Sequence, residues 1–188
     1  MQSDLALMLS ARIETPRLDL EPLEGRHAEV FFSALQDDAI YQWISMEKPT
    51  GIEPLREHWQ SIETRLSPDH QYAWATWAVR RKADGVYLGR VDAEITDDLE
   101  VTNLGYYLFS PHWGHGYATE AVTAATQSLL ARGARRLVAT VTVGNKASAR
   151  VLEKAGFAFA RVLPGNDTIR GVKFDDDEYV RSATAPDC

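Results

Sequence analysis

The sequence predicts an α+β domain built on one mixed β-sheet, and two observations support this. The predicted elements do not alternate evenly but follow the order strand, two helices, three strands, helix, strand, helix, two strands. Of the 188 residues, 45% are hydrophobic and 25% are charged, so a chain of one-domain length carries enough apolar material for a core. We expect a single domain over residues 14–181, with flexible termini at 1–13 and 182–188.

The first half predicts one strand, two helices and a three-stranded antiparallel group. Apolar and polar residues alternate from Arg17 to Pro22, as they do in a half-buried strand. Apolar residues at helical spacing follow over Gly25–Leu35 and Glu53–Leu66. Asp84-Gly85 is a strong turn signal between the next two strands. The three strands are expected at 71–80, 86–95 and 101–109.

In the second half, helices and strands follow one another more closely. A long helix is expected over Tyr117–Arg132, with Gly133 as its stop, and a short one over Asn145–Ala155. Strands are expected at 137–143, 157–163 and 174–181. The loop Pro164-Gly165-Asn166-Asp167 joins the last two strands, and the acidic run of residues 175–178 is expected at an exposed hairpin tip.

Charge and composition exclude several classes of function. The net charge of −7 argues against a nucleic-acid binder that works by counterion release, and it suits a cationic partner. No apolar run is long enough to span a membrane, and no signal peptide is recognised. The one cysteine, Cys188, excludes an internal disulfide. We therefore expect a cytoplasmic protein without nucleic-acid or membrane partners.

Two glycines mark the entrance of the long helix. Gly114 and Gly116 follow a strand and precede the helix that begins at Tyr117. The first turn of a helix leaves backbone N–H groups unpaired, and the helix dipole adds partial positive charge, so this order of elements suits a pyrophosphate. A dinucleotide fingerprint would need a third glycine where Thr119 stands, and a P-loop would need Gly-Lys. Gly105, inside the preceding strand, indicates either a close backbone approach or a packing gap.

The segment Trp113-Gly114-His115-Gly116-Tyr117-Ala118 resembles the acetyl-CoA pyrophosphate loop of the GNAT superfamily, in the form found in its RimJ/RimL branch. Trp113 departs from the general pattern, which has a basic or amide residue there. The resemblance covers residues 14–181, and further agreement comes from three other segments: Glu14-Thr15-Pro16-Arg17-Leu18, Leu104-Gly105-Tyr106, and Asn145-x-x-Ser148 ahead of Val151-Leu152-Glu153-Lys154-Ala155-Gly156-Phe157.

The resemblance implies a GNAT fold, with a mixed, mostly antiparallel sheet of seven strands and about four flanking helices. The sheet would be splayed between the 101–109 and 137–143 strands, with acetyl-CoA as co-substrate in the gap and no metal. The backbone amide of Phe109 would hold the oxyanion. The cofactor-binding residues would be Leu108, Phe109, Ser110, Trp113, Gly114, His115, Gly116, Tyr117, Ala118, Thr119, Asn145 and Ser148.

Candidate acid and base residues each have a structural alternative. The resemblance implies that Ser148 protonates the departing thiolate, whereas the same serine could simply cap its helix. Glu94 is the candidate base, on a strand face that it shares with Arg90 and Asp92 and that could instead be only solvated. Some GNAT enzymes carry a glutamate where this chain has Thr140. A base acting through water, or no base, stays possible.

The histidine and tryptophan side chains have structural interpretations. His112 and His115 have no third ligand at metal-site spacing. The other histidines, at positions 27, 58 and 70, are expected on the surface. The tryptophans at positions 59, 74 and 77 could line an acceptor cleft, although core packing is the expected role for most of them.

The function expected from this resemblance is acetyl transfer from acetyl-CoA to a primary amine, foremost the α-amine of a protein or peptide N-terminus. Two alternatives stay open. One is an acetyltransferase for a small amine such as a polyamine, an aminoglycoside or an amino-acid-like compound. The other is a non-catalytic acyl-CoA-binding module. The protein is expected to be a monomer or a homodimer.

Overall fold

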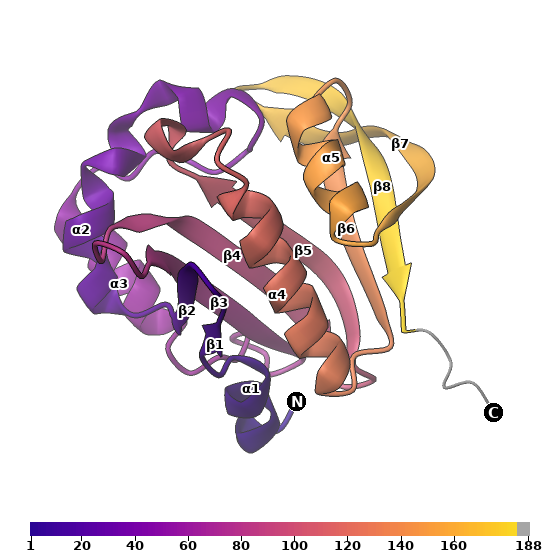
Figure 1. Cartoon of the computed structure of the whole chain (residues 1–188), viewed down its shortest axis with the longest axis horizontal. Helices are drawn as coiled ribbons and strands as arrows, with labels where there is room; N and C mark the ends of the chain where they lie inside the picture. Colours follow the sequence, from indigo (N-terminus) through magenta and orange to yellow (C-terminus); the bar gives the residue numbers. More distant parts are fainter. Residues whose placement is uncertain (184–188) are drawn as a thin grey trace.

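The computed structural model describes residues 1–183 (Figure 1). Eight strands form a single sheet in the order β1-β2-β3-β4-β5-β6-β8-β7. The helices are α1 (Ser3–Leu9), α2 (Ala28–Phe32), α3 (Ile52–Ser61), α4 (Tyr117–Ala131) and α5 (Lys146–Lys154). The strands are β1 (Ile13–Glu14), β2 (Leu18–Pro22), β3 (Tyr72–Arg81), β4 (Tyr87–Thr96), β5 (Glu100–Leu108), β6 (Arg136–Thr142), β7 (Ala158–Ile169) and β8 (Val172–Ser182).

The sheet is splayed at its centre, between β5 and β6. These two strands run parallel and pair only at their first residues, Glu100 with Arg136 and Val101 with Leu137. Every other neighbouring pair in the sheet is antiparallel. Beyond the two pairs, β5 and β6 diverge toward their carboxyl ends, where α4 and α5 begin (Figure 1). The α+β class and the splayed sheet are therefore confirmed.

Two hydrophobic clusters cover opposite faces of the sheet. One joins α1, α4 and α5 to the strands, with Ala125 and Leu129 of α4 fully buried against it. The other joins α2 and α3 to the opposite face, where Phe31 meets the Trp59 ring edge-on at 5.2 Å. Trp59 and Trp77 are core residues, as expected for most of the tryptophans. Figure 1 shows α4 lying across the sheet and α2 and α3 at one end of it.

The N-terminal segment corrects one expectation. Residues 1–13, expected as a flexible leader, contain α1, whose Ala6 and Leu9 are fully buried, and the eighth strand, β1. These elements account for the eighth strand and the fifth helix, where seven strands and about four helices were expected. From residue 184 onward, the tail expected over 182–188, including Cys188, lies outside the described residues.

Two predicted helices are shorter or more broken than expected. The segment 25–35 divides into a 3-10 turn at Gly25–His27, then α2, then a second 3-10 turn at Ala34–Gln36. Helix α3 ends at Ser61 instead of Leu66. Arg65 adopts a left-handed φ of 61°, and Leu66 then pairs with Ala73 of β3. His27 is fully buried, so the prediction of a surface position for it was wrong.

The last hairpin turns at a different place from the one predicted. Strand β7 continues through Pro164–Asp167 with a bulge in its register, and the chain reverses at Arg170-Gly171. Both turn residues have positive φ, at 51° and 79°, as a two-residue type I′ turn requires. The acidic run of residues 175–178 consequently lies within β8 and not at the tip, and Asp176 is only 3% exposed. No helix in the described part of the chain is long and apolar enough to cross a membrane.

Candidate active site

Backbone groups of β5 face the gap in the sheet. The N–H of Phe109 donates to the Leu88 carbonyl at 2.8 Å, within the β4–β5 ladder. Hydrogen-bonding direction alternates along an antiparallel strand, so the N–H of Leu108 points the other way, into the gap. The carbonyl of Leu108 accepts from the Trp113 indole at 2.6 Å. The oxyanion donor predicted at Phe109 is thus already bonded within the sheet, and the available amide is that of Leu108.

The glycine loop leads directly into α4. Gly114 and Gly116 have left-handed φ values of 78° and 77°, and no atom outside the adjoining residues lies within 3.4 Å of a Cβ placed at either one. Gly116 is the N-cap residue of α4, and the first helical hydrogen bond runs from the Glu120 N–H to the Gly116 carbonyl. The N–H groups of residues 117–119 therefore precede the first helical donor, Glu120, and are free to bind an anion.

An acidic residue in the first turn of α4 holds this loop against the N-terminal segment. Glu120 accepts from the Thr15 hydroxyl at 2.6 Å and from the Arg17 guanidinium at 2.6 Å, while Arg17 also donates to the His115 carbonyl at 3.2 Å. Burial works against ionisation, but these hydrogen bonds keep the pKa of Glu120 below its usual range. The Thr-Pro-Arg motif near the start of the chain therefore fixes the position of the glycine loop.

A cavity of about 460 Å³ opens beside the loop, on the side of the sheet covered by α4 and α5. It is lined by most of the predicted cofactor-binding residues: Leu108, Trp113, Gly114, Gly116, Tyr117, Ala118, Thr119, Asn145 and Ser148. We call it the cofactor cavity. Arg150 and Lys154 of α5 also line it, and sequence reasoning missed them. Their spacing of four residues, which places both on one helix face, was the available signal.

Three of the predicted cofactor-binding residues do not line this cavity. Phe109 is buried in the hydrophobic cluster of α2 and α3. The Ser110 hydroxyl donates to the Asp37 carboxylate. The His115 ring stacks on Tyr117 at 5.8 Å, with its Nδ1 2.8 Å from the Trp113 carbonyl oxygen.

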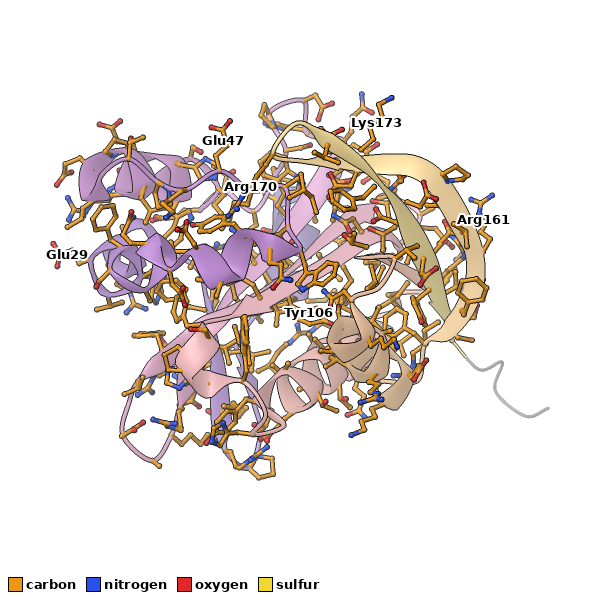
Figure 2. The ribbon with its side chains drawn as sticks, turned by 90° about the horizontal axis from the view of Figure 1, so that it is seen from above. Glu29, Glu47, Tyr106, Arg161, Arg170 and Lys173 are labelled. Carbon is orange, nitrogen blue, oxygen red and sulfur yellow. The ribbon has the colours of Figure 1, made fainter. Side chains whose placement is uncertain are left out.

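Ser148 lies at the start of α5, where its backbone and its hydroxyl have different partners. Its N–H donates to the Asn145 side chain at 3.2 Å, so Asn145 provides the cap. Its hydroxyl lies 2.7 Å from the Tyr106 hydroxyl of β5. Burial raises the pKa of Tyr106 to about 12, so this phenol stays protonated at neutral pH. Figure 2 shows Tyr106 well inside the molecule, beside the helix that carries Ser148.

A second cavity, of about 280 Å³, lies on the opposite side of the gap. We call it the acceptor cavity. Tyr106, Ser148 and Asn145 line both cavities, as do Trp43 and Ile44 from the segment after α2. The acceptor cavity also contains three carboxylates, those of Asp92, Asp167 and Asp176. The two cavities therefore meet at the Tyr106–Ser148 pair.

Strand β4 contributes an ion pair to the acceptor cavity. The Arg90 guanidinium donates to Asp92 Oδ1 at 3.0 Å. Gly105 is the residue opposite Asp92 on β5, and a Cβ there would lie only 2.8 Å from Asp92 Oδ2. Gly105 therefore marks a close approach and not a packing gap. The candidate base Glu94 is not among the residues that line this cavity. It accepts from the Thr102 hydroxyl at 2.9 Å and the Trp74 indole at 3.3 Å.

Other predicted positions can be placed as well. Thr140 lines the acceptor cavity, whereas Trp59, Trp74 and Trp77 are not among its lining residues. His112 lines the cofactor cavity, and burial lowers its pKa. Within residues 1–183, no three His, Cys, Asp or Glu side chains are grouped as metal ligands.

Comparison with known proteins agrees with this architecture. The acetyltransferase (GNAT) domain family matches residues 17–158. The N-acetyltransferase YoaA of Bacillus subtilis, itself uncharacterized, is 24% identical over 89% of this chain and 94% of its own length. RimJ of Mycobacterium smegmatis, solved with a coenzyme A disulfide, has a TM-score of 0.82 at 18% identity and covers 94% of this chain and 89% of its own.

A second solved structure has the same fold. The ribosomal L7/L12 α-N-protein acetyltransferase RimL in complex with coenzyme A has a TM-score of 0.80 at 19% identity, covering 91% of this chain and 97% of its own. The match over residues 17–158, the splayed sheet and the glycine loop at the start of α4 all agree. The protein therefore belongs to the GNAT family and is an acetyl-CoA-dependent acyltransferase.

Proposed function

We propose that the protein transfers the acetyl group of acetyl-CoA to the α-amino group of a protein or peptide N-terminus. The observation that carries this proposal is the meeting of two unlike cavities at Ser148. The cofactor cavity has free helix amides and two cationic side chains, which suit phosphates. The acceptor cavity has three carboxylates, which suit an amine that arrives as a cation.

The residues at the junction supply the chemistry of acyl transfer. The Leu108 N–H would stabilise the oxyanion that forms when a neutral amine attacks the thioester carbonyl. The Ser148 hydroxyl would protonate the departing thiolate, and the Tyr106 hydroxyl, 2.7 Å from it and also donating to the Ser148 carbonyl at 3.0 Å, would hold Ser148 in position. A thiol has a pKa near 8.5, so the leaving group needs only modest acid assistance.

The choice of an α-amine follows from proton affinity and from the fold neighbours. An α-amino group has a pKa of about 7.7–8.0, so on the order of a tenth is neutral at pH 7, whereas less than about one part in a thousand of a lysine amine is neutral. An α-amine therefore needs less help from the enzyme. RimL, with the same fold, is described as an α-N-protein acetyltransferase.

Matched peptides test the proposal directly. One peptide has a free N-terminus and no lysine, and the other has a blocked N-terminus and one free lysine. We expect kcat/KM at pH 7 to be at least tenfold higher for the free N-terminus, measured as thiol release from acetyl-CoA. Preference for the lysine peptide, a polyamine or an aminoglycoside would assign a different acceptor. Binding of acetyl-CoA without thiol release in the presence of any of these amines would support a non-catalytic module.

A further inference from the structure

Two buried polar atoms on residues that line the acceptor cavity have no hydrogen-bond partner among the described residues. They are Oδ1 of Asp176 and the hydroxyl of Tyr107. The other carboxylate oxygen of Asp176, Oδ2, accepts from the Asn166 side chain at 2.8 Å. Most buried polar groups in folded proteins are satisfied, because an unsatisfied one costs about 1–3 kcal/mol and more when it is charged. Both residues line the acceptor cavity, so a ligand bound there would supply the missing partners.

Asp176 forms no ion pair within the described residues, unlike another buried aspartate of the same sheet. Asp19 is a second buried aspartate, and its carboxylate meets Arg12 and Arg80 at 2.9 Å each. No described Lys, Arg or His nitrogen lies within 4.0 Å of the Asp176 carboxylate, whose neighbours in register are Thr142 on β6 and Leu163 on β7. The charge of Asp19 is thus balanced by two arginines of the protein, whereas no cation among the described residues balances that of Asp176.

We propose that Asp176 binds the ammonium group of the acceptor and takes the proton that must leave before the nitrogen attacks. The Tyr107 hydroxyl, in the same wall, donates to the first peptide carbonyl of the acceptor. An N-terminal residue carries an amine and a carbonyl on one carbon, so a carboxylate and a hydroxyl donor together match it. A lysine side chain offers only the amine. This inference rests on the proposed function and assigns its acceptor site.

The proton balance is complete with these groups. Asp176 removes one proton from the ammonium, and the freed lone pair forms the C–N bond to the thioester carbonyl carbon. The C–S bond breaks, and sulfur receives a proton from Ser148. The nitrogen loses its second proton as the amide forms, and this proton replaces the one that Ser148 delivers. The proton on Asp176 returns to solvent, so the acetylated amine, the free thiol and one proton are released.

Three other charged residues line the same cavity: Arg90 and Asp92 of β4, and Asp167 of β7. Burial raises the pKa of Tyr107 to about 12, so its hydroxyl is a donor at neutral pH. Glu178 lies two residues beyond Asp176 on β8 and pairs with Arg161.

The test compares Asp176→Asn with two other variants, each of which removes one negative charge; the first is a control outside the cavity and the second is a cavity carboxylate. Asp175→Asn changes the exposed neighbour, which accepts from the Gly165 N–H at 2.7 Å. Asp167→Asn changes another cavity carboxylate, which accepts from the Thr168 N–H at 2.7 Å. For Asp176→Asn we expect kcat/KM for the N-terminal peptide to fall about 100-fold at pH 7, within the usual range for loss of a general base. We expect Asp175→Asn to stay within about threefold of the wild type, and Asp167→Asn, which removes a cavity charge that attracts the acceptor, to lose clearly less than Asp176→Asn.

The pH profile separates a catalytic role from a structural one. The deficit of Asp176→Asn should shrink above pH 8, because the α-amine then loses its proton without help. The dissociation constant for acetyl-CoA should not change. A folded Asp176→Asn protein with wild-type kcat/KM, or with an equal deficit at every pH, would overturn the proposal. An equally large loss in Asp167→Asn would do the same.

A second variant keeps the test decisive if Asp176→Asn does not fold. Tyr107→Phe removes a hydroxyl that has no described partner, so it should fold normally. We expect KM to rise about tenfold for the N-terminal peptide and to stay unchanged for an amine without an adjacent carbonyl, such as the blocked lysine peptide. Equal changes for both acceptors would contradict the proposal. Failure of the proposed function would look different, since the wild type itself would then release no thiol with the N-terminal peptide.

Discussion

The two cavities on either side of the splayed sheet have opposite chemistry. The cofactor cavity lies between the N-termini of α4 and α5 and carries Arg150 and Lys154. The acceptor cavity lies on the other side of the gap and carries three carboxylates against the single cation Arg90. Under the proposed function, each cavity would attract one substrate and repel the other. The sheet would then separate the phosphates of the co-substrate from the acceptor amine, and the reacting groups would meet at Ser148.

The largest effect is expected from a change at the junction, which belongs to both cavities. Ser148→Ala removes the hydroxyl beside Tyr106 and leaves the Asn145 cap in place. We expect kcat to fall by about 100-fold and KM for acetyl-CoA to stay within about twofold, because the group acts only as the thiolate leaves. Steady-state kinetics and thermal melting check this. Full turnover with a lower melting temperature would reduce Ser148 to a structural residue.

A change on the cofactor side should leave the acceptor side intact. Gly116→Val puts a branched side chain at the mouth of the helix amides, and acetyl-CoA affinity should fall more than tenfold, or about 1.4 kcal/mol. Calorimetry measures this. Gly171→Val is the matched control, because Gly171 has nearly the same φ, 79°, but lies in the β7–β8 turn, away from the cofactor cavity. If both variants lost acetyl-CoA affinity equally, backbone strain at positive φ would explain the effect.

A change on the acceptor side should raise KM for the amine and leave the affinity for acetyl-CoA unchanged. Gly105→Ala places a methyl group 2.8 Å from the present position of Asp92 Oδ2, so the carboxylate must move. We expect KM for the amine to rise roughly fivefold, about 1 kcal/mol, with an unchanged acetyl-CoA dissociation constant. If Asp92 carries this effect, the double variant with Asp92→Asn will be no worse than Asp92→Asn alone. Additive losses would show that Gly105 acts independently.

The smallest effect concerns stability in a region outside both cavities. Nδ1 of His27 accepts from the Glu24 N–H at 2.9 Å, so the ring is neutral, and burial lowers its pKa below the usual 6.5. Below about pH 6.5 the unfolded chain binds a proton that the folded protein does not. The free energy of unfolding therefore decreases as the pH is lowered, by up to about 1.4 kcal/mol per pH unit. Denaturant titrations from pH 7.5 to 5.5 should show this slope. His27→Gln should flatten it, and an unchanged slope would exclude His27 as its source.

The cofactor side was largely predictable from sequence because its parts are contiguous. The loop at 113–119 and the Asn145-x-x-Ser148 turn each lie within a few residues, and local geometry fixes them. The amide predicted as oxyanion donor, that of Phe109, is bonded to the Leu88 carbonyl, because a single strand does not reveal which of its amides face the neighbouring strand. Tyr106 was visible as part of a motif, but its partner Ser148 lies 42 residues away.

The acceptor side could not be predicted in the same way. Its carboxylates come from β4, β7 and β8, and only the sheet order brings them together. Asp176 was placed at a hairpin tip because Pro164-Gly165-Asn166-Asp167 is typical of a turn, whereas the actual turn, Arg170-Gly171, lacks the usual Asn-Gly or Asp-Gly pair. Nothing in strand β4 itself shows that Asp92 lines the acceptor cavity and that the candidate base Glu94 does not.

The two residue pairs that join β5 to β6 have a thermodynamic consequence. They make a narrow seam between a five-stranded and a three-stranded part of the sheet. A co-substrate bound in the gap would contact both sides of this seam. At a concentration 100 times its dissociation constant, such a ligand adds about 2.7 kcal/mol to the unfolding free energy. We therefore expect folding stability and co-substrate occupancy to be linked across this seam.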